Sequence, residues 1–398
     1  MVYDSPPRKF DDTGDDVCST TNSGMRLKTI DVRHVYSDGL KLRPAGSTRW
    51  DLVSLGEVML RFDPGEDRIS RTRSFRVWEG GGEYNVARGL RRCFGLRTSI
   101  VTVLADNPVG RLIEDLMLQG GVDLSHLHWA PYDGIGRECR NGIYFLERGN
   151  GLRGALGMMD RGHTPISQLS FGQIDWETVF AAEGSRWFHT GGVMVALSVT
   201  APEVVREAMV AARRNGTIVS FDCNYRPSLW KEHGGRAASI ATNRMLMPYV
   251  DVLFGHGGDI ASNIDETSHA VPWHDETSYG AMAARIVEEF PQIAVIATTT
   301  RRPRTANHND WAALAYSQGV VLRSRDYLDL EVFDRVGGGD SFAAGVIYGL
   351  LSANGMSWAL ECGVAHGALA MTTPGDSSMA TLDEVERLMS GASAGVQR

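Results

Sequence analysis

The feature of this sequence that most constrains its fold is the alternation of short apolar runs with longer amphipathic segments. The apolar runs are typical of strands buried on both faces, and the segments between them have helical periodicity. The predicted strands lie at 51–60, 98–104, 186–191, 217–224, 251–256, 293–299 and 311–317. The predicted helices lie at 83–95, 108–121, 202–216, 279–290, 341–353 and 357–371. This alternation predicts a three-layer α/β/α domain, with a mostly parallel central sheet covered on both faces.

Two stretches break the alternation, at 68–78 and 138–149. In both, polar and apolar residues alternate singly, which is typical of strands with one face exposed to solvent. We therefore expect a small antiparallel sheet, with strands near 66–79 and 136–149, that projects from the main domain.

Residues 1–48 are polar and carry clusters of Asp, Ser, Thr, Gly and Pro. This composition predicts a disordered or loosely docked extension, so we expect one folded domain over residues 49–398. The first 24 residues lack the apolar core of a secretory signal, and no apolar run approaches the ~20 residues that span a bilayer. The five cysteines are widely spaced and odd in number, as expected of reduced thiols in a cytoplasmic protein.

The formal net charge is −8, which argues against a broad basic face for nucleic acid. A small basic pocket for a phosphorylated or acidic ligand remains compatible with this charge. No His, Cys or Asp residues have the spacing of a structural metal site.

A run of three glycines, Gly337, Gly338 and Gly339, stands directly before Asp340 in the segment FDRVGGGDSFAAGVIYGLL at 333–351. The backbone N–H groups in the first turn of a helix have no intrahelical partner, and the helix dipole makes this end positive. Glycines allow a ligand to approach these groups closely. The segment therefore predicts an anion hole suited to phosphate. It is not a Walker A loop, because the Gly-Lys-Ser/Thr ending is absent.

A carboxylate in an anion hole has a role if a hydroxyl attacks the terminal phosphate of a nucleotide. Asp340 would take the proton of the hydroxyl, and the glycine N–H groups would stabilise the charge on the transferring group. The alternative is that Asp340 only caps the helix, because Asp is a favoured N-cap residue.

The segment DRVGGGDSFAAG resembles the signature of the PfkB (ribokinase-like) carbohydrate kinases, in which the Asp is the catalytic base. The segments GEVMLRFDP at 56–64 and GGGEYNVARGL at 80–90 are similar to the N-terminal substrate-binding signature of that family. The resemblance extends from residue 51 to the C-terminus. It implies a ribokinase-like fold with a β lid, and phosphorylation of a sugar by ATP.

Within the family, the chain most resembles the 2-keto-3-deoxygluconate kinases, which phosphorylate a terminal hydroxyl of a sugar acid to give the 6-phosphate. The segments that carry this resemblance are GIYFLERG (142–149), FDCNYRPSLW (221–230), DRVGGGDSF (334–342) and TPGDSS (373–378). Arg226 follows a predicted strand that ends in Asp222 and Asn224, so it should lie at the C-terminal edge of the sheet. A guanidinium there can bind the carboxylate of a sugar acid with two hydrogen bonds.

The resemblance implies further substrate-binding residues on the first helix, on the small sheet and in the loop after 357–371. They are Gly81, Gly82, Asn85, Tyr144, Arg148 and Asp376. Other roles remain open for three of them. Tyr144 can be an ordinary cross-strand aromatic, Arg148 a solvated charge at a strand end, and Asn85 a helix cap.

The nucleotide is expected along the last strands of the sheet. Thr299 and Arg301, in ATTTRR at 297–302, lie where the family contacts ATP, and Gly337 and Gly339 would bind its phosphates. Mg²⁺ is expected to arrive with the nucleotide. The expected ligands are therefore a small sugar acid and ATP, with neither nucleic acid nor membrane as a partner. A homo-oligomer formed through the lid is a further expectation.

The sequence departs from the subgroup at 256–259, where His-Gly-Gly-Asp replaces Asn-Glu-Glu-Asp, a motif that orders magnesium and its waters. Asp259 keeps the one carboxylate suited to a metal. Met159 also replaces an aromatic residue, and Ala370-Met371 replaces Lys-His. Three functions stay open on these grounds: a sugar-acid kinase, a ribokinase-like kinase for another sugar, and a weakly active or inactive sugar- or nucleotide-binding protein on the same fold.

Overall fold

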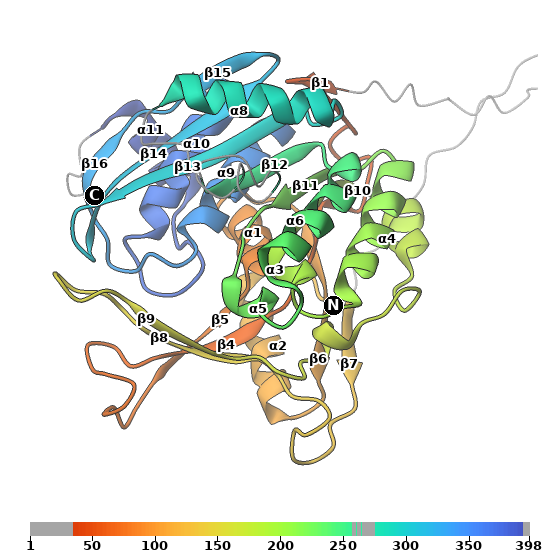
Figure 1. Cartoon of the computed structure of the whole chain (residues 1–398), viewed down its shortest axis with the longest axis vertical. Coiled ribbons are helices and arrows are strands. Elements are labelled where there is room, and N and C mark those ends of the chain that lie inside the picture. Colours follow the sequence, from red (N-terminus) through yellow and green to blue (C-terminus); the bar gives the residue numbers. More distant parts are fainter. Residues whose placement is uncertain (1–34, 257–259, 261–263, 265–274, 393–398) are drawn as a thin grey trace, which may run out of the picture. The chain divides into compact units, whose positions relative to one another are not determined.

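The computed structural model describes residues 35–256, 260, 264 and 275–392 (Figure 1). A ten-stranded sheet forms its centre, in the order β15-β14-β13-β12-β11-β10-β3-β6-β7, with β16 also paired to β14. The pairs from β7 to β13 are parallel, and the pairs beyond β13 are antiparallel. The predicted architecture is therefore confirmed, with an antiparallel edge added. The strands are β3 (Trp50–Leu55), β6 (Thr98–Ala105), β7 (Leu127–Ala130), β10 (Ser185–Gly191), β11 (Ile218–Asp222), β12 (Val252–His256), β13 (Val295–Pro303), β14 (His308–Ser317), β15 (Val320–Arg323) and β16 (Tyr327–Glu331).

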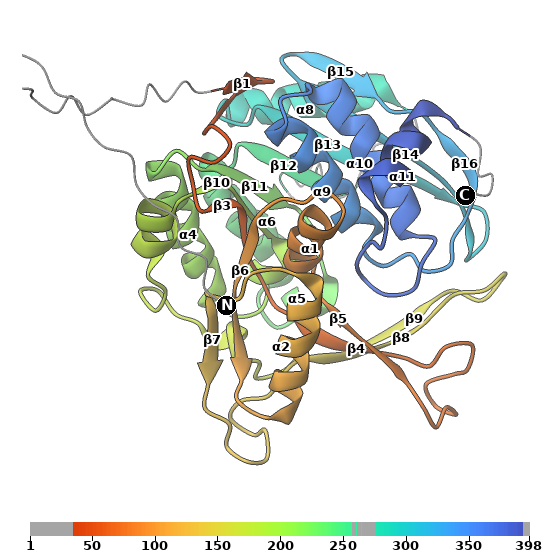
Figure 2. The ribbon, with the colours of Figure 1, turned by 180° about the vertical axis from the view of Figure 1, so that it is seen from behind.

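Helices cover both faces of this sheet. One face carries α1 (Gly82–Arg92), α2 (Pro108–Gly120), α9 (Gly338–Leu351), α10 (Met356–Ala370) and α11 (Leu382–Ser390), as seen in Figure 2. The other carries α3 (Gly192–Val195), α4 (Ala201–Arg214), α5 (Pro227–Trp230), α6 (Gly235–Leu246) and α8 (Glu276–Glu289) (Figure 1). Short 3₁₀ or π turns lie at Ile166–Gln168, Thr178–Glu183 and Met247–Tyr249.

The core consists of two apolar clusters, one on each face of the sheet. Because side chains alternate across a strand, neighbouring residues enter different clusters. Val252 and Phe254 of β12 pack on the side of α9 and α10, whereas Leu253 packs on the side of α4 and α8. Burial on both faces explains why these strands appear in the sequence as continuous apolar runs.

A separate four-stranded sheet, which we call the lid, has the order β5-β4-β8-β9. Its strands are β4 (Met59–Asp63), β5 (Arg76–Gly80), β8 (Ile143–Glu147) and β9 (Leu156–Asp160). The predicted small sheet therefore exists, but β4 and β8 pair in parallel, so it is not purely antiparallel.

Two of the strand predictions are wrong in detail. The apolar run 51–60 is two strands, because the chain leaves the central sheet after Leu55 and enters the lid at Met59. Both parts are buried, so the break is hidden in the pattern. In addition, the alternation at 68–78 becomes a strand only from Arg76 onward, and the charged residues before it form turns.

The N-terminal boundary predicted at residue 48 also needs correction. Strands β1 (Val35–Ser37) and β2 (Leu40–Leu42) form an antiparallel hairpin around Asp38-Gly39, both with positive φ. An Asp-Gly pair of this kind favours a tight hairpin turn. Leu40 and Leu42 are buried in the core, so this segment belongs to the packed domain. The remainder of the predicted extension, residues 1–34, lies outside the described residues.

No helix in the described part of the chain has both the length and the apolar character needed to cross a membrane.

Candidate active site

The predicted site residues gather where two helices begin at the C-terminal edge of the parallel strands. α1 starts at Gly82, directly after the lid strand β5, and α9 starts at Gly338, after the glycine turn. In open α/β sheets, ligands bind at this edge. The first turns of both helices provide unpaired backbone N–H groups there.

Close packing requires a glycine at two positions of the site but not at a third. Gly337 has φ +78°, and a Cβ on it would lie 1.7 Å from the backbone oxygen of Asp376. A Cβ on Gly81 would lie 1.9 Å from the backbone oxygen of Glu57. By contrast, a Cβ on Gly339 would meet no atom of the described residues within 4 Å. Gly337 and Gly81 are therefore required by close packing, whereas Gly339 faces open space.

Asp340 lies in the first turn of α9 and is held by α1. Its carboxylate accepts a hydrogen bond of 2.7 Å from Nδ2 of Asn85. The N-cap residue of α9 is Gly337, and no side chain caps this helix. The capping alternative for Asp340 is therefore wrong. Asn85 itself is buried, and its Oδ1 accepts hydrogen bonds from Ser377 Oγ at 3.2 Å and from the Gly81 N–H at 3.4 Å.

Burial raises the pKa of Asp340 from 3.8 to about 6. The hydrogen bond from Asn85 and the charge of Arg226 lower this pKa, and the nearby Asp376 raises it. A carboxylate with a pKa close to neutral suits a general base, because it is ionised at working pH and still binds a proton well.

Glu83, in the same first turn of α1, was not predicted. Its pKa is raised to about 8, mainly by burial and to a smaller extent by the nearby carboxylates of Asp340 and Asp222. Glu83 is therefore mainly protonated at neutral pH. It packs against Gly56 and Gly191, where a Cβ would approach its carboxyl group to 2.3 and 3.4 Å. No local motif distinguishes it from a surface glutamate at a helix start.

Arg226 is the N-cap residue of α5, just after β11, and its side chain is exposed. It lies close enough to Asp340 to lower the pKa of that carboxyl group. The structure therefore brings Arg226 to the edge of the sheet where the sequence predicted it.

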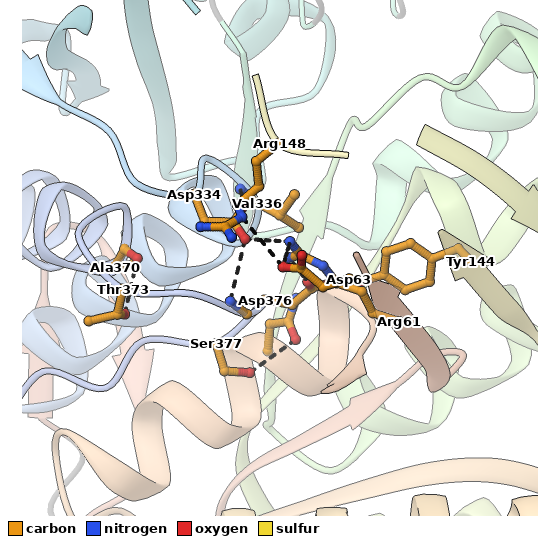
Figure 3. A network of polar contacts seen from close by, with 12 residues as sticks. Arg61, Asp63, Tyr144, Arg148, Asp334, Val336, Ala370, Thr373, Asp376 and Ser377 are labelled. Carbon is orange, nitrogen blue, oxygen red and sulfur yellow. Dashed lines mark hydrogen bonds and ion pairs between the residues drawn. The ribbon is translucent and has the colours of Figure 1, made fainter. Parts of the chain in front are cut away.

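Tyr144 and Asp376 are both buried, and they bond to one another (Figure 3). Asp376 also accepts a hydrogen bond of 2.8 Å from Arg61 on β4, which the sequence analysis did not identify. The signal for Arg61 was a single arginine inside the apolar run VMLRF, where a charge needs a buried partner. The role of Tyr144 and Asp376 in substrate binding stays a prediction.

Arg148 lies at the end of β8, with Nε 3.6 Å from Asp63 Oδ2 and its guanidinium 4.4 Å from the centre of the Phe333 ring. It lines a cavity of about 380 Å³ between the lid and the β13–β14 turn. Arg301, Arg304 and Arg335 line the same cavity together with one acidic residue, Asp334, so its wall is basic on balance.

The two residues predicted to contact the nucleotide have different environments. Arg301 lines the basic cavity, and burial together with nearby Arg335 lowers its pKa. Thr299 is buried within β13, between β12 and β14. The structure therefore brings Arg301, but not Thr299, to the cavity wall.

The predicted metal-binding residue Asp259 lies outside the described residues. Within the described ranges, no group of three His, Cys, Asp or Glu side chains is arranged to hold a metal ion. A magnesium ion that keeps several waters and binds mainly to phosphates needs no such cage.

The sequence matches the pfkB family carbohydrate kinases over residues 50–382. It is 30% identical over 349 residues to a 2-dehydro-3-deoxygalactonokinase of Haloferax volcanii, with 87% of this chain and 99% of that protein covered. A 5-dehydro-2-deoxygluconokinase of Geobacillus thermodenitrificans is 25% identical, covering 85% of this chain and 93% of that protein.

The crystal structure of a 2-dehydro-3-deoxygluconokinase from Thermotoga maritima is also similar, with a TM-score of 0.78 and 33% sequence identity. That comparison covers 85% of this chain and 98% of the other. Family match, relatives and fold agree over nearly the same residues. The chain therefore belongs to the pfkB family of carbohydrate kinases, and it is an ATP-dependent carbohydrate kinase.

Proposed function

We propose that this protein transfers the terminal phosphate of ATP to the terminal hydroxyl of a 2-keto-3-deoxy sugar acid. The preferred substrate is 2-keto-3-deoxygluconate, which becomes its 6-phosphate. The observation that carries this proposal is the placement of Asp340 directly after the glycine turn. The cationic Arg226 lies near enough to lower the pKa of Asp340. The names of the Thermotoga and Haloferax relatives support the class of substrate.

The reaction follows from the positions of these groups. The substrate hydroxyl oxygen attacks the terminal phosphorus, the bond between this phosphorus and the ADP oxygen breaks, and the hydroxyl proton passes to Asp340. The backbone N–H groups of Gly338, Gly339 and Asp340 stabilise the negative charge on the transferring group. Asn85 orients the carboxylate through its 2.7 Å hydrogen bond.

The substrate is recognised by its charge and by its hydroxyl groups. Arg226 binds the carboxylate, because an exposed guanidinium can form two hydrogen bonds to it. The first turn of α1, with Gly81, Gly82 and Asn85, binds hydroxyls. Arg148, Tyr144 and Asp376 complete the substrate side from the lid and the loop after α10.

The nucleotide extends from the glycine turn along the end of β13, with its phosphates at Gly337–Gly339 and toward Arg301 and Arg335. These arginines belong to the basic cavity beside the turn. Thr299 is included from the family pattern alone. When bound, Mg²⁺ neutralises phosphate charge, with Asp259 as the carboxylate proposed to act through its waters. We expect the protein to work in the cytoplasm, where ATP is available.

The experiment is a substrate panel with the purified chain, ATP and magnesium, with ADP formation as the readout. The panel contains 2-keto-3-deoxygluconate, its galactonate epimer, 5-dehydro-2-deoxygluconate, gluconate, ribose and fructose. We expect the highest kcat/KM for 2-keto-3-deoxygluconate. A better rate with ribose or fructose would exclude the sugar-acid assignment, and no turnover with any sugar would favour the binding-protein alternative.

A further inference from the structure

Arg61 belongs to the lid, but its guanidinium is directed into the body of the protein (Figure 3). Its side chain is 0% exposed and is surrounded by carboxylates from three separate segments. Asp63 lies on the same strand at 3.1 Å, Asp376 lies in the loop after α10 at 2.8 Å, and Asp334 precedes the glycine turn in direct contact. Burial lowers the pKa of Arg61, but Asp376 and Asp334 raise it more, so the guanidinium stays charged.

One set of contacts leads from Arg61 to the backbone of the glycine turn. Asp334, held by Arg61, accepts hydrogen bonds from the N–H of Val336 at 3.2 Å and of Gly375 at 3.4 Å. Val336 directly precedes Gly337, so the position of Asp334 fixes the start of the turn. The backbone oxygen of Asp376 packs so closely against Gly337 that no Cβ fits between them.

A second set of contacts leads from Arg61 to the catalytic carboxylate. Asp376 is followed by Ser377, whose Oγ donates to Asn85 Oδ1 at 3.2 Å. The other end of the Asn85 amide donates to Asp340. The loop that Arg61 holds is therefore joined through two hydrogen bonds to the group that takes the proton.

The lid reaches this loop from two of its strands. Arg61 comes from β4, and Tyr144, which bonds to the other oxygen of Asp376, comes from β8. The two Nη atoms of Arg61 bond to all three carboxylates, whereas its Nε has no hydrogen-bond partner among the described residues. The planar guanidinium holds carboxylates in a fixed geometry that the compact ammonium of a lysine does not provide.

Resting on the proposed function, we propose that Arg61 is a positioning residue for phosphoryl transfer. Its guanidinium holds Asp334 and Asp376, and thereby fixes the glycine turn and the carboxylate of Asp340 relative to the lid. Arg61 touches neither the substrate nor the nucleotide in this role. Small displacements of reacting groups are costly, so its effect should be seen in kcat more than in KM.

The test compares Arg61→Lys with Arg186→Lys. Arg186 is a matched control, because it is also buried and donates to the backbone oxygens of Arg43 and Leu351 at 2.8 Å. It lies at the start of β10, the end opposite the site. Both variants should lower the melting temperature. Only Arg61→Lys should lower kcat, by roughly tenfold to a hundredfold, the scale of a 1 Å misplacement.

A third variant, Ser377→Ala, interrupts the second set of contacts with almost no change in volume. We expect it to lower kcat as well, with the fold and the KM for the sugar acid little changed. The proposal is overturned if Arg61→Lys keeps the kcat of Arg186→Lys. If Arg61→Lys does not fold, Ser377→Ala decides, and an unchanged kcat in that variant overturns the proposal.

The wild type separates this proposal from the proposed function. If the wild type turns over a sugar other than a sugar acid, the substrate assignment fails, and the variants are compared on that sugar. If the wild type turns over no sugar, the proposed function fails and the positioning role fails with it. If the wild type turns over a sugar acid, the positioning role of Arg61 is decided by the kcat of each variant relative to the wild type.

Discussion

At the scale of single residues, the site depends on carboxyl groups whose burial changes their protonation. Asp340 and Glu83 lie in the first turns of two different helices and influence each other. Burial places the pKa of Asp340 near 6 and that of Glu83 near 8. Around neutral pH Asp340 is therefore mainly ionised and Glu83 mainly protonated, which agrees with the proposal that Asp340 is the base.

The first prediction concerns pH. Asp340 must be ionised to accept a proton, so kcat/KM should fall as the pH is lowered through about 6, the raised pKa of this group. The measurement is a pH profile of kcat/KM for the sugar acid. An acid limb near 3.8, the ordinary value for Asp, would contradict the role of burial.

The same shift has a consequence for stability. The native state keeps a proton on Asp340 that the unfolded chain has already released, so the stabilising contribution of this group is present at low pH and is lost as the pH rises through about 6. Asp340→Asn should therefore melt at a higher temperature than the wild type in alkaline buffer. The difference should disappear below the ordinary pKa of Asp.

The second prediction concerns Arg226. Its replacement by Ala should weaken binding of the sugar acid by about 2–4 kcal/mol, because the substrate carboxylate loses its partner. Binding of ATP should hardly change. Calorimetric titration of each ligand into the wild type and Arg226→Ala measures both effects, and equal losses for the two ligands would show a general structural defect instead.

At the scale of elements, the start of α9 combines a packing requirement with the proposed binding of phosphate. Gly337 has positive φ and packs against the backbone of Asp376, whereas Gly339 is helical and faces open space. Two glycines in one motif therefore have separable roles.

The third prediction uses this difference. Gly337→Ala should destabilise the fold by at least about 1–3 kcal/mol, the cost of backbone strain, in addition to a steric clash. Gly339→Ala should keep or slightly raise stability, because Ala favours a helix. Its methyl group should nevertheless lower kcat by roughly a hundredfold, the scale of losing one donor to the transferring group. Thermal melts and kcat measurements on both variants provide the check. Normal activity in Gly339→Ala would contradict the proposal that phosphate occupies the space beside Gly339.

The central sheet, and the closeness of Asp340, Asn85 and Arg226 to one another, could be predicted from the sequence because their signals are local. Buried strands appear as apolar runs, and Asp340, Asn85 and Arg226 lie in short motifs next to predicted helix starts or strand ends. Arg61 and Glu83 were missed because segments far away in the sequence bury their side chains, and no local motif shows such burial. The break between β3 and β4 was missed for a similar reason. The two strands belong to different sheets, but both are buried, so the sequence shows one continuous apolar run.

At the scale of the whole molecule, the lid has an exposed outer strand. β9 is at the edge of the lid sheet, and the exposed side chains of Leu156, Met158 and Met159 lie along it. An unprotected apolar edge strand is a favourable place for pairing with another chain. A second copy of this protein at this edge would form the homo-oligomer through the lid that the sequence analysis expects.

The fourth prediction follows from that edge. The wild type should sediment as a homo-oligomer, and Met158→Asp should shift it toward the monomer without lowering the melting temperature of the domain. Analytical ultracentrifugation over a range of concentrations measures this. A wild type that is monomeric throughout would show that the lid edge has no such partner.

The most direct test of the central claim is to separate binding from turnover in Asp340→Asn. The account predicts that this variant binds the sugar acid and ATP as the wild type does, because Asn keeps the shape of the side chain and can still accept the hydrogen bond from Asn85. Its kcat for sugar-acid-dependent ADP formation should fall by roughly a hundredfold or more, the scale of losing a general base. Near-normal turnover in Asp340→Asn would contradict the account.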